Sequence, residues 1–170
     1  MQYVTLNGRK VCKIAFGCEA LGGYDWGDYD IDKIENAIQI ALDNLPADCS
    51  ILFDTADTYG PYLSEQRLGK CLLGRHKQAL IATKFGVRIN DGIVHYDVSP
   101  SYADKALDGS LARLQVDQID LFQIHWMDRT NKLESTLEAL EKFCTEKRIK
   151  SYGVCNISPH TALSVKKDFP

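Results

Sequence analysis

The chain has 170 residues, of which 45% are hydrophobic and 25% are charged, and its formal net charge is -3 at pH 7. These values are typical of a globular domain and exclude a disordered, collagenous or low-complexity chain. Because 20 basic residues face 23 acidic ones, we expect no nucleic acid as the main partner, and no apolar run reaches the roughly 18–20 residues needed to cross a membrane.

The N-terminus and the cysteines indicate a cytoplasmic protein. Residues 1–5 lack the basic and then apolar layout of a signal peptide. The six cysteines are widely and irregularly spaced, which favours reduced thiols over a disulfide framework or a metal site, so we expect no metal. They are Cys12, Cys18, Cys49, Cys71, Cys144 and Cys155.

The first predicted element is a β-hairpin within residues 3–12. Residues 3–6 and 9–12 flank Asn7-Gly8, the pair that a type I′ two-residue turn prefers. Short runs that are nearly apolar throughout follow, and this pattern is typical of parallel strands buried on both faces. These predicted strands are residues 14–17, 51–54, 80–84, 119–125 and 151–154.

Each predicted strand is followed by a helix. Apolar residues recur at helical spacing, or a helix start signal such as Ser-Pro is present, in five places. The predicted helices are residues 31–44, 65–72 with Ser64 as N-cap, 100–114 with Ser99 as N-cap, 133–144, and a fifth that starts at Ser158-Pro159.

A hairpin followed by five βα units predicts an α/β fold, either a doubly wound sheet or a (β/α)8 barrel. A doubly wound dinucleotide-binding sheet would carry the pattern G-x-G-x-x-G after its first strand. Residues 17–23 contain glycines in another pattern, which favours a barrel. No linker divides residues 1–170, so we expect one domain.

Polar residues mark the carboxyl ends of the predicted strands. Asp54, Lys84 and His125 end the second, third and fourth strands, and Tyr59 follows Asp54 by five residues. Each has a structural alternative: Asp54 as a turn residue, Lys84 reaching to solvent, His125 in the core and Tyr59 packing a loop. A βα barrel builds its site at this face from several strands, so their coincidence favours a common site.

These four residue types suit proton transfer at a carbonyl. A phenol titrates near pH 10, and a neighbouring lysine ammonium would lower that pKa, while an aspartate would hold the lysine in its charged form. A histidine can donate a hydrogen bond to a carbonyl oxygen. None of these groups carries hydride, so a nicotinamide cofactor is implied.

On these residues the sequence resembles the aldo-keto reductase family, and within it the oxidoreductase branch related to potassium-channel β subunits. The resemblance implies a (β/α)8 barrel closed at its bottom by an N-terminal hairpin, and an NAD(P)H-dependent enzyme that interconverts a small carbonyl and an alcohol. The matching segments, in order along the chain, are residues 53–60, 64–69, 83–86, 110–114, 117–121, 123–126 and 152–156.

The resemblance also assigns roles to individual residues. Tyr59 resembles the proton donor, Lys84 and Asp54 its tuning partners, and His125 the residue that orients the carbonyl. Asn156 matches the second residue of a Ser-Asn pair that holds the nicotinamide amide, and Cys155 replaces the serine, which is a better hydrogen-bonding group. Trp26 and Trp126 occupy loop positions that could line a substrate pocket.

A family barrel has eight strands and about 250 residues, whereas five strands are predicted here. We therefore expect this chain to be truncated relative to the family, to bind NADP(H) or NAD(H) weakly if at all, and to self-associate through its open sheet. The alternative function is a catalytically inactive half-barrel remnant that acts as a binding or regulatory module.

Overall fold

The centre of the molecule is a five-stranded parallel sheet in the order β3-β4-β5-β8-β9. The computed structural model describes residues 2–23, 27–128 and 133–168. Neighbouring strands of this sheet succeed one another along the chain, whereas a doubly wound sheet reverses its strand order. The predicted barrel-type winding is therefore confirmed, and the doubly wound alternative is wrong. The strands are β3 (Phe16–Gly17), β4 (Ile51–Asp54), β5 (Ala79–Phe85), β8 (Ile119–Ile124) and β9 (Ile149–Val154).

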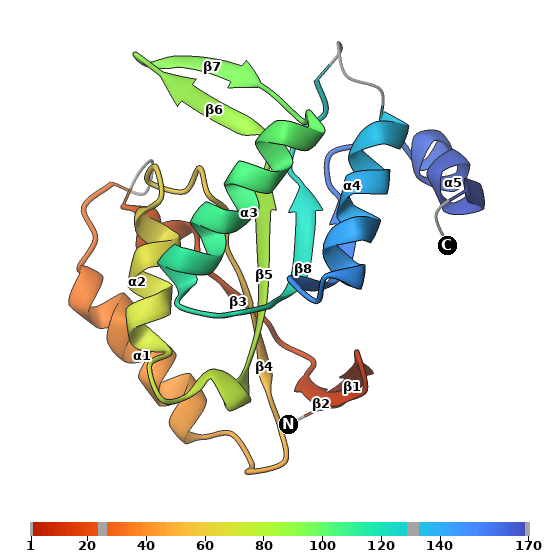
Figure 1. Ribbon diagram of the computed structural model, residues 1–170. Helices are drawn as coiled ribbons and strands as arrows, with labels where there is room; N and C mark the ends of the chain where they lie inside the picture. Colours follow the sequence, from red (N-terminus) through yellow and green to blue (C-terminus); the bar gives the residue numbers. More distant parts are fainter. Residues whose placement is uncertain (1, 24–26, 129–132, 169–170) are drawn as a thin grey trace.

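Helices cover one face of this sheet (Figure 1). Helix α1 contacts α2, α2 contacts α3, and α3 contacts α4, as expected when successive βα units lie side by side. The helices are α1 (Ile31–Asp43), α2 (Leu63–Cys71), α3 (Pro100–Leu114), α4 (Leu133–Thr145) and α5 (Pro159–Asp168), with short 3-10 turns η1 (Glu19–Gly22) and η2 (His76–Gln78).

The predicted helix starts are correct at α3 and wrong at α2. The Ser99 side chain accepts a hydrogen bond from the Tyr102 N–H at 3.3 Å, and Pro100 opens the helix, as predicted. Helix α2 instead begins at Leu63, and Ser64 lies buried inside it. The Ser64 Oγ donates to the Cys18 carbonyl at 2.6 Å, so a tertiary partner takes the hydroxyl that was expected to cap the helix.

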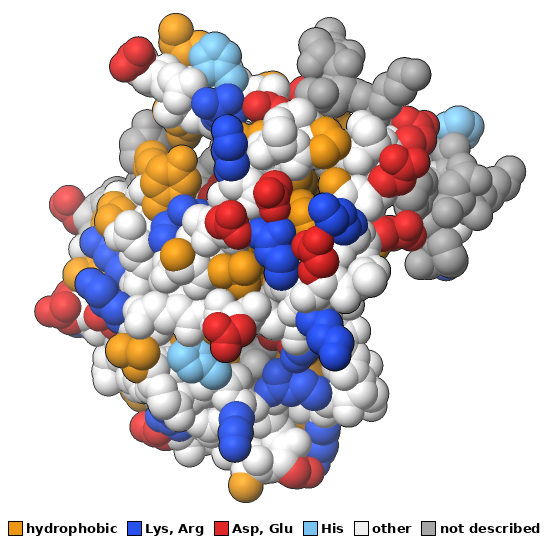
Figure 2. Space-filling model, viewed as in Figure 1, with side chains coloured by type: hydrophobic (Ala, Val, Ile, Leu, Met, Phe, Trp, Pro, Cys, Tyr) orange, Lys and Arg blue, Asp and Glu red, His pale blue; other side chains and the backbone are white. Residues whose placement is uncertain are grey.

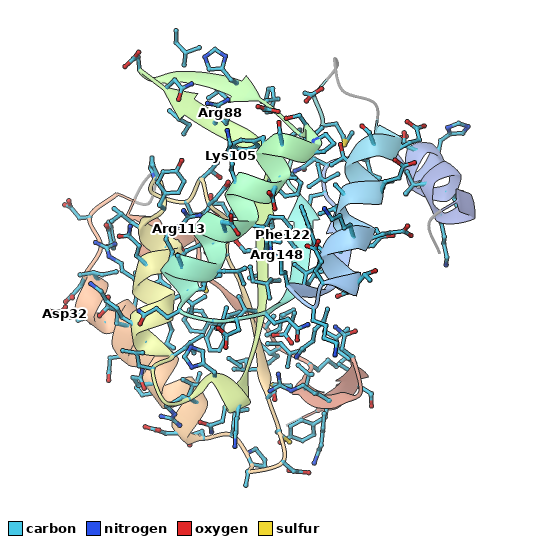
Figure 3. All side chains as sticks on the ribbon, in the orientation of Figure 1. Asp32, Arg88, Lys105, Arg113, Phe122 and Arg148 are labelled. Atoms are coloured by element: carbon cyan, nitrogen blue, oxygen red, sulfur yellow. The ribbon has the colours of Figure 1, made fainter. Side chains whose placement is uncertain are left out.

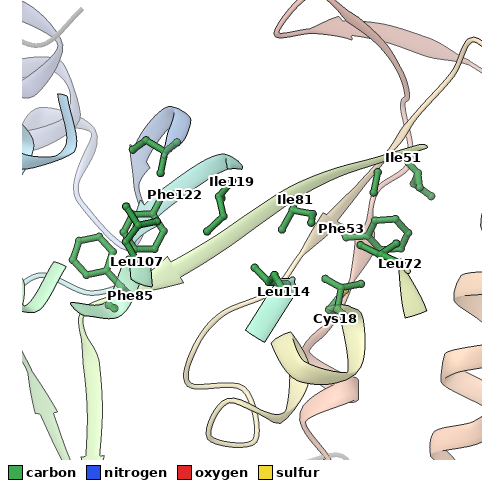
Figure 4. Packing of buried hydrophobic residues seen from close by; sticks show 14 of the residues in the cluster. Cys18, Ile51, Phe53, Leu72, Ile81, Phe85, Leu107, Leu114, Ile119 and Phe122 are labelled. Atoms are coloured by element: carbon green, nitrogen blue, oxygen red, sulfur yellow. The ribbon is translucent and has the colours of Figure 1, made fainter. Parts of the chain in front are cut away.

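The hydrophobic core joins the sheet to the helices. Every residue of β5 is buried, as expected of a strand covered on both faces. The rings of Phe85 and Phe122, on neighbouring strands, are stacked with centroids 4.6 Å apart, and Leu107 of α3 lies beside them (Figure 4). Burying each such side chain contributes roughly 1.5–3 kcal/mol, which holds the strand ends in place.

The N-terminal hairpin of β1 (Tyr3–Leu6) and β2 (Arg9–Cys12) lies at the amino-terminal end of the sheet. Asn7 and Gly8 both have positive φ, 48° and 73°, as the predicted type I′ turn requires. The Arg9 Nη1 donates to the Ala79 carbonyl at 2.8 Å, and the Cys12 N–H donates to the Ser50 carbonyl at 2.8 Å. The hairpin is thus bonded to the starts of β4 and β5, away from the carboxyl edge.

A second hairpin, β6 (Val87–Asn90) and β7 (Ile93–Tyr96), was not predicted. It projects beyond the carboxyl end of β5 (Figure 1). Its turn is Asp91-Gly92, with φ of 51° and 76°. An Asp-Gly pair between alternating apolar residues is itself a hairpin signal, so the sequence contained the information for this element. The expected run of five plain βα units is corrected accordingly.

Strand boundaries differ from the predicted ones by a few residues. The first strand of the sheet is only Phe16–Gly17, β5 is longer at both ends than predicted, β8 ends before His125, and β9 starts two residues early. On the face in Figure 2, acidic and basic side chains are interspersed. All six cysteines are free thiols. In the described ranges, no helix has the length and apolar character that crossing a bilayer requires.

Candidate active site

The structure brings Asp54, Tyr59, Lys84 and His125 together at the carboxyl edge of the sheet. The Lys84 Nζ lies 2.9 Å from Asp54 Oδ1 and donates to Tyr59 Oη at 3.4 Å. The rings of Tyr59 and His125 meet edge to face, with centroids 5.9 Å apart. Parallel strands bring their carboxyl ends to one edge, which explains how residues up to 71 positions apart in the chain become neighbours.

Lys84 is a buried cation with a full set of partners. Only 6% of the residue is exposed, and its ammonium also donates to the Thr55 carbonyl at 2.8 Å. Burial acts to lower the pKa of Lys84, but the hydrogen bond and charge of Asp54, together with Tyr59, outweigh it and raise the pKa above its usual value. Lys84 is therefore charged at neutral pH, and its orientation is set by three oxygen atoms.

Tyr59 differs from the expectation that its pKa would be lowered. Burial of the phenol raises the pKa by more than the charge and hydrogen bond of Lys84 lower it, so the pKa lies above its ordinary value. The expectation rested on the neighbouring cation alone, whereas desolvation of the phenol has the larger effect on its pKa. The consequence is that Tyr59 keeps its proton at neutral pH, which is the form that a proton donor needs.

His125 is neutral at physiological pH. Burial, and then the nearby charge of Lys84, lower the pKa of His125 to about 4. Its backbone N–H donates to the Phe85 carbonyl at 2.8 Å, which fixes the residue at the end of β8. Its Nδ1 is buried and has no hydrogen-bond partner among the described residues. A neutral imidazole can donate one N–H to a carbonyl oxygen.

Asn156 and Cys155 lie next to this group, at the end of β9. The Asn156 Nδ2 donates to the His125 carbonyl at 2.8 Å, and Asn156 has a positive φ of 54°. The Cys155 thiol donates to Gln123 Oε1 at 3.5 Å. Both residues therefore share the edge that carries His125. Their role in holding a nicotinamide amide stays a prediction.

A cavity of about 460 Å³ opens beside Tyr59 and His125. Trp126, 45% exposed, lines it together with residues of the β6–β7 hairpin. Trp26, the other predicted pocket residue, lies outside the described residues. The lining residues are Glu19, Thr58, Tyr59, Gly60, Val87, Ile89, Gly92, Val94, Tyr96, His125 and Trp126.

A buried polar network that joins α2, α3 and β5 was not predicted from the sequence. Glu65 of α2 is fully buried, and its Oε2 lies 2.6 Å from Arg113 Nε of α3. Arg113 is labelled on α3 in Figure 3. The Thr83 hydroxyl of β5 donates to Glu65 Oε1 at 2.6 Å. This network ties α2 to the strand that carries Lys84. Its members come from three separate elements, and although each lies in a family-like segment (64–69, 83–86 and 110–114), local patterns do not show that they meet.

Asp57, two residues before Tyr59, is a buried carboxyl group close enough to Glu65 and Arg113 to feel their charges. It is 2% exposed, and its Oδ1 has no hydrogen-bond partner among the described residues. Burial, and then the negative charge of Glu65, raise the pKa of Asp57 well above its usual range. A protonated carboxyl group avoids placing a second negative charge beside Glu65.

The Tyr59 loop is positioned by a direct backbone contact. A Cβ placed on Gly60 would lie 1.8 Å from the Gly22 carbonyl oxygen, and a Cβ on Gly22 would lie 2.6 Å from the Gly60 nitrogen. Gly60 also has a φ of 58°, a conformation that favours glycine. Two glycines thus let the η1 loop and the Tyr59 loop cross closely enough to place the phenol beside Lys84.

A parallel sheet wound as in a barrel, with an acid, a lysine, a tyrosine and a histidine at its carboxyl edge, defines an α/β-barrel protein with a site suited to proton transfer. The family model described as "Aldo/keto reductase family" matches residues 13–170, so the chain belongs to that family.

Individual relatives agree with this assignment. The aldo-keto reductase YhdN of Bacillus subtilis (strain 168) is 32% identical over 162 residues, which are 93% of this chain and 48% of YhdN. An aldo-keto reductase from Bacillus halodurans in its holo form superposes with a TM-score of 0.82 at 32% identity, covering 98% of this chain and 54% of that one. The glycerol dehydrogenase from Gluconobacter oxydans superposes with a TM-score of 0.84 at 31% identity, covering 99% of this chain and 52% of that one. This chain therefore spans about half the length of these relatives.

Proposed function

We propose that this chain carries the proton-transfer site of an NAD(P)H-dependent oxidoreductase that interconverts a small carbonyl compound and an alcohol, in the branch related to potassium-channel β subunits. The observation that carries the proposal is the position of the Lys84 Nζ, 2.9 Å from Asp54 Oδ1 and 3.4 Å from Tyr59 Oη. Family membership supports an oxidoreductase, and the similar glycerol dehydrogenase supports a carbonyl–alcohol couple as the substrate class.

The residues at the end of β8 and β9 fit a nicotinamide ring. An amide substituent needs a donor and an acceptor, and the carboxamides of Asn156 and Gln123 supply both types of group at the edge that carries His125. A bound NAD(P)H would supply the hydride that no side chain can provide. The chain's own residues have the remaining tasks, which are to bind the carbonyl oxygen and to deliver or accept its proton.

In the reducing direction the substrate oxygen accepts hydrogen bonds from Tyr59 Oη and from the neutral imidazole of His125. As negative charge develops on that oxygen, Tyr59 transfers its proton to it. The Lys84 ammonium then stabilises the phenolate that is left, because it already donates to Tyr59 Oη. Asp54 keeps Lys84 charged and in position throughout. The reverse sequence would oxidise an alcohol.

The experiment is the Tyr59→Phe substitution, which removes the proton and leaves the ring. Turnover of small aldehydes should fall by about 10²–10⁴-fold, measured as the decrease of NADPH or NADH absorbance. The matched control is Tyr62→Phe, since Tyr62 lies three residues after Tyr59 and is 47% exposed. Equal rates for the wild type and Tyr59→Phe, with unchanged circular dichroism, would contradict the proposal.

A further inference from the structure

The β6–β7 hairpin has one apolar face and one mostly polar face. Its register pairs Val87 with Tyr96 and Ile89 with Val94, and these two pairs share a face because strand side chains alternate. The intervening pairs, Arg88 with His95 and Asn90 with Ile93, lie on the opposite face. Such alternation normally directs the apolar face to a core, but this hairpin projects from the body of the molecule (Figure 1).

The apolar face lines the cavity of the proposed site. Val87, Ile89, Val94 and Tyr96 line it together with Tyr59 and His125, whereas no residue of the polar face does. Ile89 is 43% exposed and Val94 is 50% exposed. Exposed apolar residues gathered on one wall of a cavity are typical of a surface that binds an apolar ligand group.

The polar face fixes the base of the hairpin to the rest of the fold. The Arg88 Nη1 lies 3.3 Å from Asp97 Oδ2 in an ion pair, and the Arg88 guanidinium lies over the Tyr102 ring of α3, 5.1 Å from its centroid. The Asp97 N–H donates to the Gly86 carbonyl at 3.0 Å, and Gly86 turns the chain with a φ of 107°. The apolar face is thus held toward the cavity by contacts made on the other face.

We propose that the β6–β7 hairpin selects carbonyl substrates with an extended apolar chain, and that straight-chain aliphatic aldehydes are the class that fits. This inference rests on the proposed function. An aldehyde whose oxygen is bonded to Tyr59 and His125 extends into the cavity, where Ile89 and Val94 exclude water from its methylenes. A substrate whose carbon chain carries hydroxyl groups would lose hydrogen bonds to water against this apolar wall, and such substrates are therefore disfavoured. Glu19 and Thr58 are polar residues elsewhere on the lining.

The test compares kcat/KM for propanal, butanal, pentanal and hexanal on the full chain with NADPH. For the wild type we expect a rise in kcat/KM of roughly fourfold per added methylene, since burying each methylene is worth about 0.8 kcal/mol. Val94→Ser should flatten this rise. Ile93→Ser makes a similar change on the neighbouring residue of the opposite face and should leave the rise intact, which controls for general effects on the hairpin.

A second readout separates this inference from the proposed function. Calorimetric titration with propanamide and hexanamide, which the protein cannot reduce, measures chain-length selection without turnover. If aldehydes are not reduced but hexanamide binds more tightly than propanamide, and Val94→Ser removes the difference, the hairpin inference stands while the function fails. Flat dependence on chain length in both assays, or equal effects of Val94→Ser and Ile93→Ser, would overturn the hairpin inference.

Discussion

A single methyl group added at Gly60 would separate the two loops that place Tyr59. The Cβ of Gly60→Ala would lie 1.8 Å from the Gly22 carbonyl oxygen and 2.4 Å from its carbonyl carbon. Both are backbone atoms, so no side chain can rotate away to make room. The residue would also need to keep its φ of 58°, in the left-handed region.

The expected cost has two parts. The left-handed conformation costs a residue with a Cβ roughly 1–2 kcal/mol, and overpacking at a close contact adds roughly 1–3 kcal/mol. Gly60→Ala should therefore lower the free energy of unfolding by about 2–5 kcal/mol. Gly74→Ala is the matched control, because Gly74 has a φ of 73° but its Cβ would meet nothing within 4 Å. Gly74→Ala should therefore lower the free energy of unfolding only by the cost of the left-handed conformation, roughly 1–2 kcal/mol.

Urea unfolding followed by circular dichroism measures both variants. Since the clash lies next to Tyr59, Gly60→Ala should also reduce kcat/KM, by about 100-fold if the phenol moves by about 1 Å. Gly74→Ala should leave kcat/KM unchanged. If Gly60→Ala is no more destabilising than Gly74→Ala, the close crossing of the two loops does not hold Tyr59 in place and the reasoning is wrong.

Two further predictions concern buried charge. The pKa of His125 is about 4 in the folded chain, below its ordinary value near 6.5. As the pH falls from about 6.5 to about 4, the imidazole is therefore protonated in the unfolded chain but not in the folded one. The free energy of unfolding should fall over this range. His125→Gln should remove that part of the pH dependence in urea titrations, and an unchanged slope would contradict the pKa. Arg113→Met should destabilise the protein by about 3–5 kcal/mol because it leaves Glu65 buried without its cation. The double variant Glu65→Gln/Arg113→Met should recover part of the loss in thermal unfolding, and a fully additive loss would count against the pair.

Local patterns in the sequence were enough to predict the order of the βα units and which polar side chains meet at the carboxyl edge of the sheet. Continuous apolar runs between amphipathic stretches predict buried parallel strands, and the carboxyl ends of such strands share one edge. That geometry alone places Asp54, Lys84 and His125 together, with Tyr59 in the adjoining loop. The Asp91-Gly92 turn could have been predicted in the same way, since its signal is local.

The tertiary structure decided the features that depend on contacts between distant segments. Desolvation of Tyr59 outweighs the charge of Lys84, and burial is a property of the packed fold. Ser64 caps no helix because the Cys18 carbonyl takes its hydroxyl. The pairing of Glu65 with Arg113, 48 residues further along the chain, follows from the packing of α2 on α3.

The sequence by itself thus determined which residues meet at the carboxyl edge, because strand direction and chain order follow from local hydrophobic patterning. Only the tertiary structure determined the protonation states of Tyr59 and His125 and placed the apolar face of the β6–β7 hairpin beside them. The pKa of a group depends on the solvent that the whole fold excludes, and the apolar wall of the cavity depends on the direction in which Gly86 and Arg88 hold the β6–β7 hairpin.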